Sequence, residues 1–480
     1  MDTFADILLI ALPGAPAVGA LAAGFCPVKA TKTIRAIGWG FSIATFVAWI
    51  VLRAIAPDGE GLLVSVAWPW VPDLGFGLHF GIDQTGIMMA GMVSFVCVVA
   101  MVGTLPFLPE LNRSRIVFLL LAEAGMLGVV TAWDLILFIA FWEVTLVPFF
   151  FLMGRGPVRG GVNAATRFFV TSVASSVLMW VGVLIVVKTA GLPRTFDLVE
   201  LSARLSNSSI YIADIMWLFV PAFLVRMAAV PLHTWFPLAS GTVSTAASIL
   251  LAGGVLPLGG YGLIHIMGRL CGSDMIVLSP WLVWIGVVTA LGGGVASIVQ
   301  RDLKRLFAFV CLAQMGLVLV GLTFPFVEGN RAGPLMLVSL GLGGACLFLF
   351  AGVVCKARGS QRIAEISGLW RSHPFFAGMS FAGVASLAAI PGTCGFVGVA
   401  TVLRGTTSNL LVTLLLASAV LIAGGSVVWA YRRVLGGSHQ PAVWAGYEWP
   451  RKRQATILAL LAIVIVVTGV LPGIIGGALQ

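Results

Sequence analysis

Apolar residues occur along this chain in long runs, each about as long as a membrane-spanning helix. A spanning helix needs about 20 apolar residues, and no polar segment between the runs is long enough to form a soluble domain. The pattern predicts an all-α polytopic membrane protein with a single membrane domain over residues 1–480 and 14 helices. These lie near 5–25, 33–53, 85–107, 114–131, 133–153, 163–189, 209–235, 240–270, 276–299, 303–323, 332–355, 373–403, 408–431 and 452–476.

Two of these runs contain the same proline-terminated motif, 160 residues apart. It reads Ala-Ala-Val-Pro at 228–231 and Ala-Ala-Ile-Pro at 388–391. Interrupted hydrophobic segments at matching positions of two halves are typical of repeat-built transporters, whose ion path lies near the breaks. We therefore predict two inverted five-helix repeats, helices 4–8 at 114–270 and helices 9–13 at 276–431. Helices 7 and 12 are broken at Pro231 and Pro391, and the flanking parts are helices 1–3 (1–110) and a final helix (452–476).

The longest connection between predicted helices runs from about 54 to 84. Its segments Leu62–Val71 and Leu74–Ile82 are rich in Val, Trp, Phe and Gly around Pro69, Pro72 and Asp73. This composition predicts a short β-hairpin lying on the membrane surface. Within 240–270, the Gly259-Gly260 pair predicts a bend.

Composition and charge agree with a membrane protein and exclude other classes. The chain is 59% hydrophobic and 10% charged, with a mean hydropathy of +1.07. Of its 28 Lys and Arg residues, 20 fall in the odd-numbered connections and 7 in the others. The positive-inside rule then places both termini on the outer side of a bacterial inner membrane. The net charge of +10 sets topology and indicates no nucleic-acid surface. Asp2 and Asp6 are not typical of a cleaved signal peptide, and seven cysteines without a CxxC motif indicate no metal site.

Ionisable residues inside the predicted helices are the functional candidates, because burying a charge in the bilayer is costly. Glu143 lies in the middle of helix 5, Arg226 precedes the break in helix 7, and Glu123 lies halfway along helix 4. Glu143 and Arg226 can neutralise each other. They form either part of a proton relay or a structural ion pair. A guanidinium has a pKa above about 12, so Arg226 can tune Glu143 but is a poor proton carrier.

Histidines supply further candidates near the first break. His233 follows Pro231 and could either shuttle protons or donate to carbonyl groups freed by the proline. His265, towards the outer end of helix 8, is expected in an interfacial structural role. Asp302, Lys304 and Arg305 are expected to be solvated charges at the start of helix 10.

Five segments spread over most of the chain carry a common pattern. They are FWEVTLVP (141–148), LVRMAAVPLHTWFP (224–237), ASILLAGGVLPLGGYGLIHI (247–266), IVQRDLKRLFAFVCLAQMG (298–316) and IPGTCGFVG (390–398). Together these segments resemble the antiporter-like M subunit of respiratory complex I (NADH:quinone oxidoreductase). The L subunit's long lateral helix is not expected, because Gln480 follows the last helix directly.

The resemblance implies a polar axis of titratable residues across the membrane, from which this chain departs. The family has a Glu–Lys pair in helices 5 and 7, a Lys in helix 8, histidines in helices 10 and 11, and a Glu in helix 12. Glu143 matches the family glutamate. The other positions hold Arg226 for the first lysine, Pro257 for the second, Gln314 for the first histidine, Leu340 at or next to the second, and Val399 for the last glutamate. We expect proton translocation to be lost or reduced.

Three functions remain open on the sequence. The first is a structural M-type subunit with a degenerate channel in a complex I-like oxidoreductase. The second still pumps protons by a rerouted path through Glu123, Glu143, Arg226 and His233. The third is a subunit of a cation/proton antiporter or an inorganic-carbon uptake complex. The resemblance implies that this chain is not catalytic alone and binds no cofactor, with NADH, FMN, Fe–S clusters and quinone on partner subunits. The expected partners are L-, N- and K-type chains and lipids, in a hetero-oligomer.

Overall fold

The structure is a computed structural model of an almost entirely helical chain. It describes residues 2–57, 59, 61–103, 112–156, 160–206, 212–271, 275–324, 329–436, 452–471 and 473. Parts of several predictions lie outside these residues: the end of the first region (104–110), the start of helix 7 (209–211) and the end of the final helix (472 and 474–476).

Within the described residues, twelve helical segments are long and apolar enough to cross a membrane. Eleven are single helices, and the twelfth, Thr245–Cys271, is built from five consecutive pieces. Their bounds are α1 (Asp2–Phe25), α2 (Thr31–Ile55), α3 (Gln84–Gly103), α4 (Arg113–Thr131), α5 (Leu135–Gly154), α6 (Gly161–Thr189), α11 to α13 with two π turns (Thr245–Cys271), α14 (Met275–Ile298), α15 (Leu303–Thr323), α16 (Gly329–Arg358), α20 (Leu410–Leu435) and α22 (Lys452–Val470).

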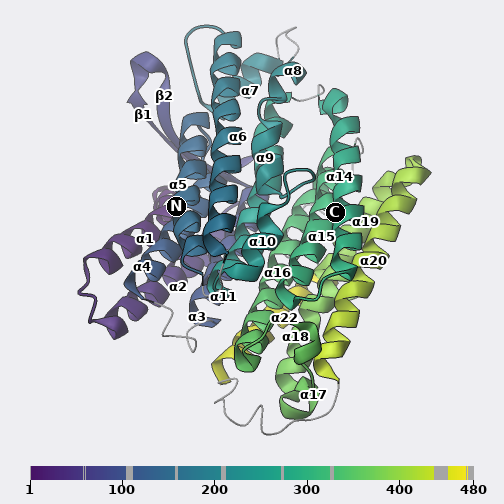
Figure 1. Cartoon of the computed structure of the whole chain (residues 1–480). Helices are drawn as coiled ribbons and strands as arrows, with labels where there is room; N and C mark the ends of the chain where they lie inside the picture. Colours follow the sequence, from purple (N-terminus) through teal and green to yellow (C-terminus); the bar gives the residue numbers. More distant parts are fainter. Residues whose placement is uncertain are drawn as a thin grey trace.

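The remaining two predicted helices are the broken ones, which confirms both interruptions. Helix 7 consists of α8 (Ala213–Met216), α9 (Val220–Arg226) and α10 (Trp235–Thr242). Helix 12 consists of α18 (Pro374–Leu387) and α19 (Cys394–Gly405). Two short helices, α7 (Leu198–Ser206) and α17 (Leu369–Ser372), lie at opposite ends of the molecule (Figure 1). The arrangement is the predicted all-α polytopic fold.

The predicted β-hairpin is also present. Strands β1 (Leu62–Val71) and β2 (Phe76–Asp83) pair antiparallel and lie at the same end of the molecule as α7 (Figure 1). Gly75 closes the turn with φ +75°, and a Cβ on it would lie 2.2 Å from the Arg194 carbonyl oxygen. Both the left-handed conformation and the close approach require glycine. The hairpin therefore packs directly against the connection between α6 and α7.

Burial divides the helices into a core and a lipid-facing shell. The most apolar stretches of α3, α15, α16 and Thr245–Cys271 are almost wholly buried, whereas fewer than half of the residues in those of α2, α14, α20 and α22 are buried. A helix that is apolar on all sides belongs in the interior. Small residues let helices approach closely: a Cβ on Gly316 of α15 would lie 2.3 Å from the Ala290 nitrogen of α14.

The expected bend at Gly259-Gly260 takes a different form. These glycines lie inside α12 (Leu256–Gly262), and the irregular backbone lies on either side of it, in π turns at Leu251–Val255 and Leu263–Met267. A Cβ on Gly259 would lie 2.7 Å from the Met227 nitrogen. The glycine therefore permits close packing against the break in helix 7.

Candidate functional site

The first helix break ends α9 directly after Arg226. The Ala229 N–H donates to the Leu224 carbonyl at 2.9 Å, and the Ala228 N–H donates to the Val225 carbonyl at 3.1 Å. Ala228 itself is in the left-handed conformation, with φ +51°. Such a pair of bonds around a left-handed residue closes many helix C-termini, where the left-handed residue is usually glycine.

The second break repeats this geometry. The Ile390 N–H donates to the Ala385 carbonyl at 2.8 Å, and the Ala389 N–H donates to the Ser386 carbonyl at 3.2 Å. Ala389 has φ +53°. The two broken helices therefore stop in the same way, with an alanine in a conformation that costs an L-residue about 1–2 kcal/mol.

The residues of the two breaks that are equivalent in backbone geometry are offset by one position from those that the sequence motif aligns. Aligning the two prolines pairs Ala228 with Ala388, but the hydrogen bonds pair Ala228 with Ala389. Pro231 consequently lies one residue further beyond its break than Pro391 does. The backbone geometry, and not the proline position, is what the two halves share.

Arg226 is enclosed at the end of α9. Its side chain is fully buried, and Nη2 donates to the Trp142 carbonyl at 2.7 Å. The guanidinium carbon lies 4.4 Å from the Trp142 ring centroid and 5.9 Å from that of Phe168, within the range of cation–π attraction to both rings. Nε and Nη1 have no hydrogen-bond partner in the described structure.

Glu143, on α5, is near Arg226 without bonding to it. Its Oε1 is buried with no hydrogen-bond partner among the described residues, and no nitrogen of Arg226 bonds to it. The interaction between the two side chains is an electrostatic attraction across a gap. The sequence correctly places these charges on neighbouring helices, but the direct ion pair that would neutralise them is not formed.

His233 lies in the turn between α9 and α10 and is half-buried. Its Nδ1 is buried without a hydrogen-bond partner in the described residues. This nitrogen is therefore available to a further partner at the break.

Glu123 is separate from this group. Its side chain, on α4, is fully buried, and the Ser42 hydroxyl of α2 donates to Oε2 at 2.5 Å. The face of α4 that packs against α5 contains Gly125 and Gly128, because a Cβ added to these glycines would meet Thr145 and Phe141 of α5. Because Glu123 points to α2 instead, the structure does not bring it together with Glu143.

The four positions at which the resemblance implies a titratable residue and this chain has none are all buried in the core. Pro257 is in α12, Gln314 in α15, Leu340 in α16 and Val399 in α19. The Gln314 amide donates to the Leu387 carbonyl at 2.7 Å, a group left free by the end of α18. An amide thus caps the second broken helix, and none of the four side chains can titrate.

Lys304 corrects the expectation of a solvated charge cluster. It is only 4% exposed, and its Nζ lies 3.4 Å from the Val243 carbonyl oxygen just before Thr245–Cys271 begins. It lines a cavity of about 540 Å³ together with Asp302 and Lys356. Burial raises the pKa of the Asp302 carboxyl above its ordinary value. Its burial could not be predicted, because a buried lysine at a helix start has the same local sequence pattern as an exposed one.

His265 also differs from the expected interfacial role, because it is fully buried. Its Nε2 donates to the Ala132 carbonyl at 2.8 Å, and its Nδ1 lies 3.0 Å from Nη1 of Arg269. A ring that donates from one nitrogen and accepts at the other is neutral. Arg269 in turn bonds Asp83 of β2 at 2.5 Å and lies 4.4 Å from the Trp133 ring centroid. This network joins helix 8 to the hairpin.

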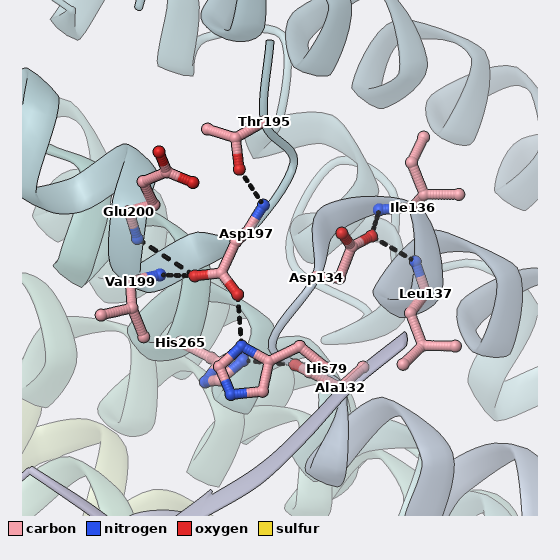
Figure 2. A network of polar contacts seen from close by, with 10 residues as sticks. All are labelled: His79, Ala132, Asp134, Ile136, Leu137, Thr195, Asp197, Val199, Glu200 and His265. Atoms are coloured by element: carbon pink, nitrogen blue, oxygen red, sulfur yellow. Dashed lines mark hydrogen bonds and ion pairs between the residues drawn. The ribbon is translucent and has the colours of Figure 1, made fainter. Parts of the chain in front are cut away.

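A second set of polar contacts also holds the hairpin. His79 of β2 donates to the Asp197 carboxylate ahead of α7 (Figure 2). The Trp133 backbone N–H donates to the His79 carbonyl at 2.8 Å. Burial works to raise the pKa of the Asp197 carboxyl, but the hydrogen bonds from His79 and two backbone N–H groups hold it below its ordinary value. Burial raises the pKa of neighbouring Asp134 to about 6.

The ionisable groups are therefore distributed unevenly. Charged or titratable side chains are found at the first break, at the hairpin end and at Lys304, whereas the second break is lined by Gln314, Ser386 and Cys394. Within the described residues, no group of three or more His, Cys, Asp or Glu is placed to hold a metal ion. The arrangement can hold a fixed buried cation beside a carboxyl group in its first half.

Comparisons of sequence identify the relatives of this chain. Residues 132–423, more than half of the chain, match the family described as NADH:quinone oxidoreductase/Mrp antiporter, TM. NAD(P)H-quinone oxidoreductase chain 4 2 of Microcystis aeruginosa is 31% identical over 82% of this chain and 73% of that protein. NADH-quinone oxidoreductase subunit M of Rickettsia bellii is 26% identical over 82% of this chain and 80% of that protein.

Solved structures share the fold. A chain of respiratory complex I from Thermus thermophilus has a TM-score of 0.83 and 22% identity, covering 98% of this chain and 96% of that one. A chain of the Mrp complex from Dietzia sp. has a TM-score of 0.84 and 20% identity, covering 97% and 95%. The chain belongs to the NADH:quinone oxidoreductase/Mrp antiporter family of membrane subunits, among its M-type, antiporter-like members.

Proposed function

We propose that this chain is the M-type membrane subunit of an NADH:quinone oxidoreductase and that no proton crosses its second half. The observation that carries the second claim is the absence of a titratable side chain at four axis positions of the described core. These are Pro257, Gln314, Leu340 and Val399. Proton transfer across a membrane interior needs titratable groups or water.

Water is disfavoured at these positions for a physical reason. Leu340 and Val399 are 1% and 3% exposed and are apolar. A buried water needs two to four polar partners, and neither side chain offers one. Gln314 is already bonded to the Leu387 carbonyl. A proton in the first half therefore meets no titratable side chain or water that could carry it beyond helix 8.

The first half supports a positioning role for Arg226. A guanidinium remains protonated, and this one is fixed by the Trp142 carbonyl and by two aromatic rings. Its fixed positive charge attracts the Glu143 carboxyl group across the gap between the two side chains. It cannot deliver its own proton as a lysine would.

The rerouted path is the second candidate, and its geometry is less favourable. It requires Glu123 to exchange protons with Glu143, yet Glu123 accepts from Ser42 on the face of α4 turned to α2.

The identity of the partner subunits distinguishes a redox complex from a transport complex that has no redox module. We propose L-, N- and K-type chains as neighbours, with NADH, FMN, Fe–S clusters and quinone held by partner subunits. Both termini are then on the outer side of a bacterial plasma membrane. Mass spectrometry of the complex purified in mild detergent tests this. Recovery of NADH-oxidising subunits supports it, and an assembly containing only transporter subunits contradicts it.

Thiol labelling tests the dry second half. In Val399→Cys, a charged, water-soluble methanethiosulfonate reagent should not react above the rate of the wild-type chain, which has seven cysteines of its own. Ser360→Cys, in the polar cavity beside Lys304, should react readily and is the matched control. Labelling of Val399→Cys at a rate close to that of Ser360→Cys would reveal water in the second half and overturn the proposal.

A further inference from the structure

A cavity unrelated to the polar residues lies between α2, α3, α16 and α22. Its volume is about 350 Å³, within the range of about 300–1,000 Å³ typical of small-ligand sites. The lining is apolar apart from one cation and one hydroxyl. It includes Phe46, Trp49, Met92, Val338, Val464 and Arg53.

The cavity lies towards the hairpin-side ends of α2 and α3. On α2 the lining runs from Phe46 to Arg53, two residues before that helix ends, and on α3 from Ile87 to Phe95, starting three residues after that helix begins. At 1.5 Å per residue these stretches span about 10–12 Å. Half of the hydrocarbon core is about 15 Å thick. The cavity is therefore about as deep as one leaflet.

One wall of the cavity is rigid and aromatic. The Trp49 indole N–H donates to the Ile87 carbonyl at 2.8 Å, and its ring stacks on Phe46 with 5.5 Å between centroids. A Cβ on Gly91 would lie 2.2 Å from the Trp49 ring. Glycine at this position lets the indole lie flat against α3. The space beside the ring is thus held open by fixed groups.

The other side of the cavity faces lipid. Ile463 and Val467 of α22, which line it, are 56% and 38% exposed. At its outer end Arg53 lies in the last turn of α2, at the depth where the membrane interface begins. A guanidinium at that depth matches the phosphate of a lipid headgroup in charge and geometry. The combination is an apolar slot one leaflet deep with a cation at its mouth.

We propose that this cavity binds one acyl chain of a phospholipid from the hairpin-side leaflet, with the lipid phosphate at Arg53. An acyl chain fills an apolar slot along its length, whereas an α-helix is about 10–12 Å wide with its side chains and could insert only side chains. An anionic phospholipid is preferred, because its phosphate charge is not offset by a cationic headgroup.

Quenching of Trp49 fluorescence by brominated lipid tests the proposal. The full chain is reconstituted in phosphatidylcholine vesicles containing increasing fractions of acyl-brominated phosphatidylglycerol. The difference between wild type and Trp49→Phe isolates Trp49 among 15 tryptophans. Trp281, 67% exposed on α14 and outside the cavity, gives the bulk-lipid response through Trp281→Phe. We expect Trp49 quenching to saturate at a lower brominated fraction than Trp281 quenching.

Two substitutions separate the parts of the site. Val338→Phe fills the slot and should abolish Trp49 quenching, whereas Ile50→Phe, on the exposed face of α2, should not. Arg53→Gln should remove the preference for phosphatidylglycerol, whereas Lys188→Gln, a cation at the end of α6, should leave it unchanged. Trp49 quenching that parallels Trp281 quenching, or that is absent in the wild type, would overturn the proposal.

Discussion

Replacing Ala389 by glycine should stabilise the second helix break by about 0.7 kcal/mol. Ala389 has φ +53°, and the left-handed conformation costs an L-residue about 1–2 kcal/mol. Glycine avoids this cost but loses about 0.5–1 kcal/mol more backbone entropy on folding. Because Ala389 is only half-buried, little packing is lost with its methyl group. The difference between the midpoints of the two ranges is about 0.7 kcal/mol in favour of Ala389→Gly.

The same break supplies a matched control, and the first break supplies a second comparison. Ala388 has φ −88°, so Ala388→Gly relieves no strain and should destabilise by about 0.5–1 kcal/mol. Ala228, with φ +51°, is fully buried. Losing its methyl group costs about 0.8 kcal/mol, so Ala228→Gly should be close to neutral.

Hydrogen exchange measured by mass spectrometry on the chain in detergent reports the effect locally. The Ile390 N–H bond to the Ala385 carbonyl, 2.8 Å long, opens when the break frays. A gain of about 0.7 kcal/mol should slow exchange there about threefold, since 1.4 kcal/mol corresponds to tenfold. Exchange that is unchanged or faster in Ala389→Gly, or equal in the two variants of this turn, would refute the assignment of strain to the positive φ.

Three further predictions concern polar contacts, each checked by thermal unfolding in detergent. Arg269→Gln breaks a half-buried ion pair to the hairpin and should destabilise by about 2 kcal/mol, whereas Arg204→Gln, in a more exposed pair, should cost under about 1 kcal/mol. Asp134→Asn should stabilise above pH 6 and have little effect below pH 4. Burial raises the pKa of this carboxyl to about 6, so its penalty accumulates as pH rises between those values. Gln314→Leu leaves the Leu387 carbonyl unbonded and should cost about 1–3 kcal/mol.

Features that depend on local sequence were predictable. The apolar runs of about 20 residues fixed the number and order of membrane helices, because only helices satisfy their backbone groups within lipid. The hairpin followed from two segments rich in Val, Trp, Phe and Gly around Pro69, Pro72 and Asp73. The helix breaks followed from the repeated motif, although the backbone equivalence of Ala228 with Ala389 did not, since sequence alignment follows the prolines.

Features that depend on long-range packing were not predictable. Asp83 and Arg269 are 186 residues apart and meet only because the hairpin folds over helix 8. Lys304 has the sequence context of a solvated helix-start charge, yet the tertiary fold buries it. Nη2 of Arg226 bonds the Trp142 carbonyl, and no nitrogen of Arg226 bonds Glu143. Charge patterns along one chain carry no information about such packing of side chains.

The proton-to-electron ratio of the intact complex tests the central claim most directly. The complex is reconstituted in vesicles with an internal pH-sensitive dye, and NADH-driven proton uptake is counted for wild type and for Glu143→Gln. NADH oxidation and subunit content serve as controls for assembly, and the corresponding substitution in a neighbouring antiporter-like subunit with a complete axis shows that the assay can detect a lost channel. We predict the same ratio for Glu143→Gln as for wild type. A lower ratio at unchanged NADH oxidation would show that protons still cross this subunit and would contradict the account.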